Sequence, residues 1–245
     1  MKILSWNILA EEWIKSSYYT KINKHILFNR SARFQRILCI LQNSNVDIIL
    51  LQEVMSSEYE MIKYHFHINY IISPLVLIQW KDEDKNEDGK KGTSGNMTLL
   101  SRNQKQFKDN FQDIKHYTFD FGLYTELKEI GICNIHLDDL SEQKRIIQIK
   151  MLEEEILYRK EKVILGGDFN EEYQENSYIY NVNEFIVRNK DFPTYYIDKK
   201  MNIDNIMTCG VFEEDTEKQY FKYPSSMQEG MLEYGSDHLP IIVEI

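Results

Sequence analysis

Residues 162–170 read Lys-Val-Ile-Leu-Gly-Gly-Asp-Phe-Asn, an apolar run that ends in two glycines and then in polar side chains. The apolar half predicts a short buried strand, and Gly166 and Gly167 allow the backbone to turn sharply where that strand ends. Asp168 and Asn170 are two positions apart, so in an extended backbone both side chains project to the same side. A carboxylate in this place can orient or deprotonate water while the amide meets a phosphate oxygen. The alternative is a plain Asp-Asn turn.

Five other short polar blocks stand at the ends of apolar runs. They are Trp6-Asn7, Gln52-Glu53, His136-Leu137, Ile203-Asp204-Asn205 and Ser236-Asp237-His238. Polar side chains at strand ends lie on the rim of a sheet, where they can converge on one site. Together they offer hard oxygen and imidazole groups, which suit one or two divalent cations and a phosphate. Taken singly, each block has an ordinary explanation: Glu53 can stabilise a helix N-terminus, and Asn7 can form a turn.

Hydrophobic periodicity predicts an α/β fold: a four-layered sandwich of two packed β-sheets flanked by helices, formed by one domain over residues 1–245. Residues 81–96 contain no apolar side chain and predict a mobile surface loop, with a substrate-gating loop as the alternative. The predicted strands are 2–8, 46–52, 68–79, 97–101, 116–121, 123–128, 130–136, 162–167, 203–208 and 239–245; the predicted helices are 32–43, 56–66, one beginning at Ser141, and 176–189.

The composition limits the kinds of partner. With 39 acidic and 29 basic residues the formal net charge is −10, which disfavours a protein that grips a long duplex through its phosphates. Cys39, Cys133 and Cys209 are odd in number and embedded in apolar runs, so we expect reduced core thiols in a cytosolic or nuclear protein. The N-terminus has no signal-peptide pattern, and no apolar stretch approaches the ~20 residues of a membrane span.

The six blocks, in this order, resemble the endonuclease/exonuclease/phosphatase superfamily over nearly the whole chain. The resemblance implies the same sandwich fold, with the site at one end. It implies that Glu53 binds a divalent cation, with Asp237 as a further ligand, and that Asn7 contacts the metal or its carboxylates. It also implies that Asp204 fixes the catalytic His238 by a hydrogen bond. The family usually has an aromatic residue after that aspartate, where this chain has Asn205.

His136 separates branches of the superfamily, because abasic-site endonucleases typically lack a histidine there, whereas deadenylase-like, deoxyribonuclease-like and phosphatase-like members have one. Residues 7–10 (Asn-Ile-Leu-Ala), 52–54 (Gln-Glu-Val) and 236–240 (Ser-Asp-His-Leu-Pro) look most like the carbon-catabolite-repression deadenylase and nocturnin group. The positions of Arg145 and Gln148 also resemble that group, where such a pair orders the helix.

The resulting hypothesis is a phosphodiesterase dependent on Mg²⁺, with Mn²⁺ as the alternative, that acts as a 3′-exoribonuclease of deadenylase type. Its expected partners are single-stranded RNA ends, with bases stacked on aromatic residues such as Tyr18, Tyr19 and Trp80. One alternative is a phosphatase or phosphodiesterase acting on a nucleotide, an inositol phosphate or a tyrosyl-linked nucleic-acid end. The non-enzymatic alternative is an inactive phosphate-binding module.

Overall fold

Two mixed β-sheets pack face to face in the computed structural model, which describes all residues except 79–92, 109–112, 158, 183, 198 and 213–217. In one sheet the strand order is β12-β13-β1-β2-β5-β3, with β4 also paired to β5; in the other it is β10-β11-β9-β8-β7-β6. The strands are β1 (Lys2–Asn7), β2 (Ile48–Met55), β3 (Tyr70–Ile72), β4 (Val76–Leu77), β5 (Ser94–Ser101), β6 (Lys115–Phe119), β7 (Gly122–Glu126), β8 (Ile130–His136), β9 (Lys162–Asp168), β10 (Ile186–Val187), β11 (Asp204–Cys209), β12 (Lys218–Tyr220) and β13 (Ile241–Glu244).

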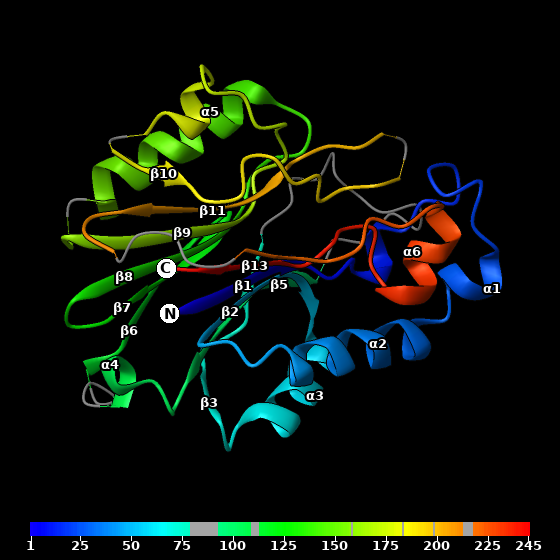
Figure 1. Ribbon diagram of the computed structural model, residues 1–245, viewed down its shortest axis with the longest axis horizontal. Helices are drawn as coiled ribbons and strands as arrows, with labels where there is room; N and C mark the ends of the chain where they lie inside the picture. Colours follow the sequence, from blue (N-terminus) through cyan, green and yellow to red (C-terminus); the bar gives the residue numbers. More distant parts are fainter. Residues whose placement is uncertain (79–92, 109–112, 158, 183, 198, 213–217) are drawn as a thin grey trace.

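Helices cover the outer face of each sheet, so the predicted four-layered α/β sandwich is confirmed. Figure 1 shows α5 on one outer side and α2 and α3 on the opposite side. The α-helices are α1 (Lys24–Leu27), α2 (Arg30–Asn43), α3 (Ser56–Phe66), α4 (Lys105–Lys108), α5 (Glu142–Leu152) and α6 (Met227–Glu233); short turns of other helical types cover Glu11–Trp13, Glu153–Leu157 and Tyr178–Tyr180. Among the described residues, no helix has the length and apolarity needed to cross a bilayer.

The central strands are buried on both faces, which explains why their sequences are almost continuously apolar. In β2, Ile48 and Leu50 belong to the core between the two sheets, whereas Ile49 and Leu51 belong to the core under α2 and α3. On α2 the side chains at helical spacing, Phe34, Ile37, Leu38 and Leu41, are buried, as predicted. Ser141 caps α5 as predicted, with its side chain accepting a hydrogen bond from Lys144 N.

The predicted helix over 176–189 is wrong. Among the described residues of this range, the structure has a single turn, Tyr178–Tyr180, and then β10, which pairs with β11. Glu184 has a φ of 61°, in the left-handed region, which no continuing α-helix accepts. The segment is rich in Asn and β-branched residues, which form helices poorly, and the unpaired edge of β11 offers it backbone hydrogen bonds instead.

Two smaller expectations also need correction. The predicted loop over 81–96 falls mostly outside the described residues, but its last three positions, from Ser94 onward, already belong to β5. Of the three thiols expected in the core, Cys133 is buried, Cys209 is half-buried and Cys39 is exposed. Cys39 lies on the outer face of α2, because its neighbours at helical spacing take the inner face.

Candidate active site

The polar blocks meet at one edge of the sandwich. Asn7, His136 and Asp168 are the last residues of β1, β8 and β9. Because β1 runs parallel to β2 and β8 runs parallel to β9, the strands of each pair end at the same edge of their sheet. Asp204 begins the antiparallel strand β11 and lies directly opposite Asp168 in the register. His238 comes just before β13, which is antiparallel to β1. The topology therefore brings together residues as far apart in the sequence as Asn7 and His238.

A pocket of about 260 Å³ opens at this edge. Its lining includes every residue proposed from the sequence as catalytic or metal-binding except Asp204, which lies behind His238. The pocket is lined by Asn7, Trp13, Lys15, Tyr18, Tyr19, Glu53, His136, Asp139, Leu140, Asp168, Asn170, Tyr195, Asp237 and His238.

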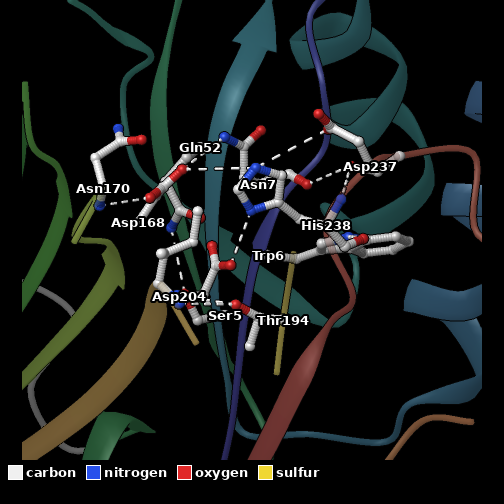
Figure 2. A network of polar contacts seen from close by, with 12 residues as sticks. Ser5, Trp6, Asn7, Gln52, Asp168, Asn170, Thr194, Asp204, Asp237 and His238 are labelled. Atoms are coloured by element: carbon white, nitrogen blue, oxygen red, sulfur yellow. Dashed lines mark hydrogen bonds and ion pairs between the residues drawn. The ribbon is translucent and has the colours of Figure 1, made fainter. Parts of the chain in front are cut away.

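Asp168 is the centre of the polar network (Figure 2). Its Oδ2 accepts a hydrogen bond from Asn7 Nδ2 at 3.0 Å. The Nε2 atoms of His136 and His238 lie 3.7 Å and 3.8 Å from the same oxygen. One carboxylate oxygen thus faces an amide and two imidazoles, and all four side chains are buried.

Asp204 and His238 form a buried pair. The Nδ1 of His238 lies 2.8 Å from Asp204 Oδ2, and the backbone N–H of Asp204 donates to Thr194 Oγ1 at 3.0 Å (Figure 2). Burial by itself lowers the pKa of His238, but the carboxylates of Asp204, Asp237 and Asp168 outweigh it and raise the pKa well above the usual value. For His136 burial prevails over Asp168 and lowers the pKa. The surroundings therefore shift the pKa values of the two imidazoles in opposite directions.

The sequence predicted that Glu53 stands at a strand end. In the structure it lies within β2 and reaches the pocket through a β-bulge. The register of β2 against β5 shifts between Leu51 and Val54, and Glu53 itself has a φ of 57°. A bulge of this kind re-aims one side chain, and a non-glycine residue in the left-handed region is a strained arrangement typical of functional sites. Leu9 and Asn170 share this backbone conformation, with φ values of 54° and 51°.

Asn170 departs from the extended geometry expected between it and Asp168. Its left-handed backbone lets its own N–H donate to Asp168 Oδ1 at 2.8 Å, which closes a tight turn. Its side-chain nitrogen donates to Leu137 O at 2.8 Å, so only the second amide hydrogen remains for a phosphate oxygen. Asn170 nevertheless lines the pocket together with Asp168.

The environment of Glu53 and Asp237 suits a divalent cation. Glu53 accepts hydrogen bonds from Asn7 Nδ2 at 2.9 Å and from Ala10 N at 2.8 Å, and both donors are neutral. Burial, and then the charge of Asp237, raise the pKa of Glu53 to about 8. Asp237 Oδ2 accepts from Tyr19 OH at 2.8 Å, while its buried Oδ1 has no hydrogen-bond partner. In the part of the chain that the structure describes, no lysine or arginine forms an ion pair with either carboxylate.

A second grouping of possible ligands overlaps this site. Ligand atoms of Asp168, Asp204 and His238 lie within 4.8 Å of one another. The Asp204–His238 hydrogen bond already uses Asp204 Oδ2 and His238 Nδ1, so only Asp204 Oδ1 and His238 Nε2 could bind a cation without replacing the shared proton. The donor set of Glu53 and Asp237 needs no such replacement.

Gln52 and the Arg145–Gln148 pair have supporting places in the structure. Gln52 is fully buried and donates to Asn134 Oδ1 at 2.8 Å, so it faces the other sheet and not the pocket. Arg145 Nη1 donates to the carbonyl of Asp138 at 3.0 Å, and Gln148 Oε1 accepts from the N–H of Asp138 at 3.0 Å. The pair thus holds the loop that follows His136.

Several pocket residues were not predicted from the sequence, among them Trp13, Lys15, Asp139 and Tyr195. They come from loops and from the short turn Glu11–Trp13, where no hydrophobic periodicity marks them. Of the residues in the segment after Asn7, only Tyr18 and Tyr19 were predicted to contact the substrate. Tyr19 is nearly inaccessible and packs in the core, so its ring is not a stacking surface. Trp80 lies outside the described residues.

Comparison with known proteins identifies the family. The family model described as "Endonuclease/Exonuclease/phosphatase family" matches residues 4–238. The chain belongs to the endonuclease/exonuclease/phosphatase family. It is a metal-dependent phosphoester hydrolase, a phosphodiesterase or phosphatase of this family. No curated protein matches the chain in a sequence search.

Solved structures share the fold of this family member at low sequence identity. ANGEL2, described as a 2′,3′-cyclic phosphatase, is 14% identical with a TM-score of 0.70, over 99% of this chain and 93% of that one. TDP2 from Caenorhabditis elegans is 19% identical with a TM-score of 0.62, over 98% and 95% of the two chains. TDP2 from D. rerio, solved with a single-strand DNA product, is 13% identical with a TM-score of 0.61, over 99% and 97%.

Proposed function

We propose that the protein is a Mg²⁺-dependent phosphodiesterase, with Mn²⁺ as the alternative ion, that acts on the ends of single-stranded nucleic acid. The leading reaction is release of 5′-mononucleotides from the 3′ end of RNA, as in a deadenylase. The observation that carries the proposal is the surroundings of Asp168 Oδ2, which faces Asn7 at 3.0 Å and two histidines within 3.8 Å. The acidic net charge supports local recognition of a strand end over a long grip on a duplex.

In this proposal Asp168 orients the attacking water and accepts its proton, because its carboxylate is buried at the centre of the pocket. His238 donates from Nε2 to a phosphate oxygen while Asp204 holds Nδ1. His136 and the second amide hydrogen of Asn170 bind the remaining phosphate oxygens. Fixed donors of this kind stabilise the negative charge that develops during in-line attack on phosphorus.

Asn7 links the two halves of the proposed site. Its amide nitrogen donates both to Asp168 and to Glu53, so it fixes the catalytic carboxylate relative to the proposed metal ligand. Glu53 and Asp237 would hold the cation, which when bound neutralises charge on the phosphate oxygens. Asp237 Oδ1 supports this assignment, because it is buried and accepts no hydrogen bond from the described residues; its contact with His238 Nε2 is at 4.0 Å.

A second candidate function is removal of a terminal or 2′,3′-cyclic phosphate, or of a group linked to a strand end. The small pocket favours it, since about 260 Å³ encloses a phosphate and part of one nucleotide. ANGEL2, a 2′,3′-cyclic phosphatase, and TDP2 have the same fold. The same residues would serve an inositol phosphate or a free nucleotide. An inactive phosphate-binding module is disfavoured, because every polar block of the family pattern is intact.

Product analysis tests the proposal. End-labelled RNA with an adenine tail, single-stranded DNA, duplex DNA, RNA ending in a 2′,3′-cyclic phosphate and AMP are incubated with Mg²⁺, with EDTA and the D168N variant as controls. We expect 5′-mononucleotides from the 3′ end of RNA, and no product in either control. Efficient internal nicking of duplex DNA would overturn the proposal. Release of terminal phosphate alone would establish the second candidate.

A further inference from the structure

A short turn at the mouth of the pocket carries Lys15 and Tyr18. The N–H of Tyr18 donates to the carbonyl of Lys15 at 2.9 Å, which closes the turn, and both side chains line the pocket. Tyr18 is 56% exposed, whereas the next residue, Tyr19, is buried and bonded to Asp237. The turn therefore continues directly from the floor of the site to its rim.

Side-chain hydrogen bonds also fix the turn on its N-terminal side. The carboxylate of Glu12 accepts from the N–H groups of Thr93 and Ser94, each at 2.8 Å. The indole N–H of Trp13 donates to Ser94 Oγ at 3.0 Å. With Tyr19 bonded to Asp237 on the other side, the segment between is held at both ends. A ligand group that binds there meets a surface already in place, which lowers the entropy cost of binding.

Lys15 is the single lysine or arginine among the described residues that line the pocket, against the acidic side chains of Glu53, Asp139, Asp168 and Asp237. Its ammonium lies 5.5 Å from the centroid of the Tyr18 ring, and among the described residues no acidic group forms an ion pair with it. A half-buried cation at a pocket mouth, next to an exposed aromatic face, offers one bond to a phosphate and one stacking surface for a base.

The size of the pocket decides which phosphate Lys15 meets. Sites that enclose a drug-sized ligand are typically about 300–1,000 Å³, and this pocket is about 260 Å³. If the reacting phosphate and its own nucleotide occupy this space, the neighbouring nucleotide would lie on the rim. On that rim stand Tyr18 and Leu140, which is 73% exposed on the loop after His136.

We propose that Lys15 and Tyr18 form a subsite for the nucleotide next to the reacting phosphate: the Lys15 ammonium donates to its phosphate group, and the Tyr18 ring stacks on its base. The subsite selects substrates with a second phosphate over isolated phosphoesters. This inference deepens the proposed function and rests on it only in taking a nucleotide as substrate.

The test compares two substrates in one set of variants. For K15M, kcat/KM on a single-stranded hexanucleotide falls about 10-fold, as expected for loss of a hydrogen bond to a charged group, mainly through KM. On bis(p-nitrophenyl) phosphate, which has one phosphate, K15M stays within about 2-fold of wild type because the missing contact is not used. The dependence of log Kd for the hexanucleotide on log salt becomes shallower by about 0.7, the share of one phosphate contact.

Y18A lowers kcat/KM on the hexanucleotide by about 5-fold or more, whereas Y18F, which keeps the stacking face, retains the wild-type value. K21M is the matched control, since Lys21 is exposed on the same segment and does not line the pocket. Equal losses on both substrates for K15M, or equal losses for K15M and K21M, overturn the subsite.

A binding comparison separates failure of the subsite from failure of the proposed function. If no oligonucleotide is cleaved, the inhibition constants of adenosine 3′,5′-bisphosphate and AMP are measured against bis(p-nitrophenyl) phosphate. Wild type should then bind the bisphosphate more tightly, and K15M should remove that preference. Equal inhibition constants in wild type overturn the subsite, whatever the nuclease assay gives.

Discussion

Asp204 and Glu53 are two buried carboxylates of the same site, and they differ in what balances their charge. Asp204 is completely inaccessible but lies 2.8 Å from His238 Nδ1, so its charge has an internal partner. Glu53 receives only neutral donors, and Asp237 adds further negative charge. The first arrangement is completed by folding alone. The charged form of Glu53 is favourable only when a cation is bound, because an uncompensated buried charge costs several kcal/mol.

The largest effect should come from breaking the internal pair. D204N should lower kcat by about 10³-fold, because an amide neither stabilises the charged imidazole nor keeps its proton on Nδ1. The variant should still fold, since the substitution conserves shape, but the loss of the buried ion pair should lower its melting temperature. Steady-state kinetics and thermal unfolding measure both quantities.

D47N is the matched control for D204N. Asp47 also accepts a backbone hydrogen bond, from Lys2 N at 2.8 Å, but at the opposite end of the strands. Its activity should match wild type. Wild-type activity in D204N would show that the Asp204–His238 pair has no catalytic role, in keeping with the departure from the family pattern at Asn205.

The next effect concerns the carboxylate that lacks an internal partner. Saturating Mg²⁺ or Mn²⁺, at about 100 times its Kd, should stabilise wild type by about 2.7 kcal/mol. E53Q should lose this stabilisation together with activity, because a neutral amide is a poor ligand for these ions. Thermal unfolding with and without metal gives the shift.

E58Q is the control for E53Q, since Glu58 is also buried but is paired with Arg30 at 3.3 Å. Its metal-dependent shift should equal that of wild type. Crystals soaked in Mn²⁺ should show the ion on Glu53. An ion between Asp204 and His238, with Glu53 unoccupied, would reverse the roles assigned to the two carboxylates.

A smaller effect of opposite sign is expected without metal. Because the pKa of Glu53 is raised to about 8, its contribution to stability is full below the unfolded-state pKa of 4.5 and is lost as the pH rises through 8. Metal-free E53Q should therefore be more stable than metal-free wild type by about 1–2 kcal/mol at pH 7, with a larger margin at pH 9. Urea unfolding in EDTA at both pH values tests this; a margin that shrinks with pH would contradict it.

The smallest effect should come from the hydroxyl group that orients Asp237. Y19F removes the 2.8 Å hydrogen bond to Asp237 Oδ2 and should weaken metal affinity by about 10-fold, as for other groups that orient a ligand. Y234F, which removes a hydrogen bond to Lys222 O away from the site, is the control. Calorimetric titration with Mn²⁺ compares the two. Equal affinities in both variants would show that Asp237 does not bind the metal.

The sequence was sufficient to predict the central strands and most of the residues on their ends, but not the short strands β10 and β12, nor the division of the predicted strand 68–79 into β3 and β4. Apolar runs such as 162–167 are buried on both faces, so their pattern is strong, and strand ends follow from where it stops. The helix 56–66 was also predicted with the bounds that α3 has. The error at 176–189 arose because a weak helical pattern competed with the open edge of β11, and this edge is a tertiary feature that the local sequence does not contain.

The geometry of the site was less predictable than its composition. The bulge at Glu53 and the left-handed backbone of Asn170 depend on neighbouring strands. Neither position is a glycine, the residue from which a left-handed conformation is usually predicted. The pocket wall formed by Trp13, Lys15 and Tyr195 comes from loops that only the folded chain brings together. Chemistry repeated at strand ends can be read from the sequence, whereas the loops that select a substrate cannot.

Asn134 is fully buried in β8, and its side chain bonds across to the other sheet. Its Nδ2 donates to the carbonyls of Leu51 at 3.1 Å and Met97 at 2.8 Å, and its Oδ1 accepts from Gln52. Apolar contacts between sheets have no preferred direction and would tolerate sliding, but these three bonds fit one alignment only. A slip of one residue, about 3.3 Å, would part Asn7 on one sheet from Asp168 on the other. Asn134 thus fixes the alignment of the two sheets. Its replacement should lower the catalytic rate as the loss of a catalytic residue would, although Asn134 does not contact the substrate.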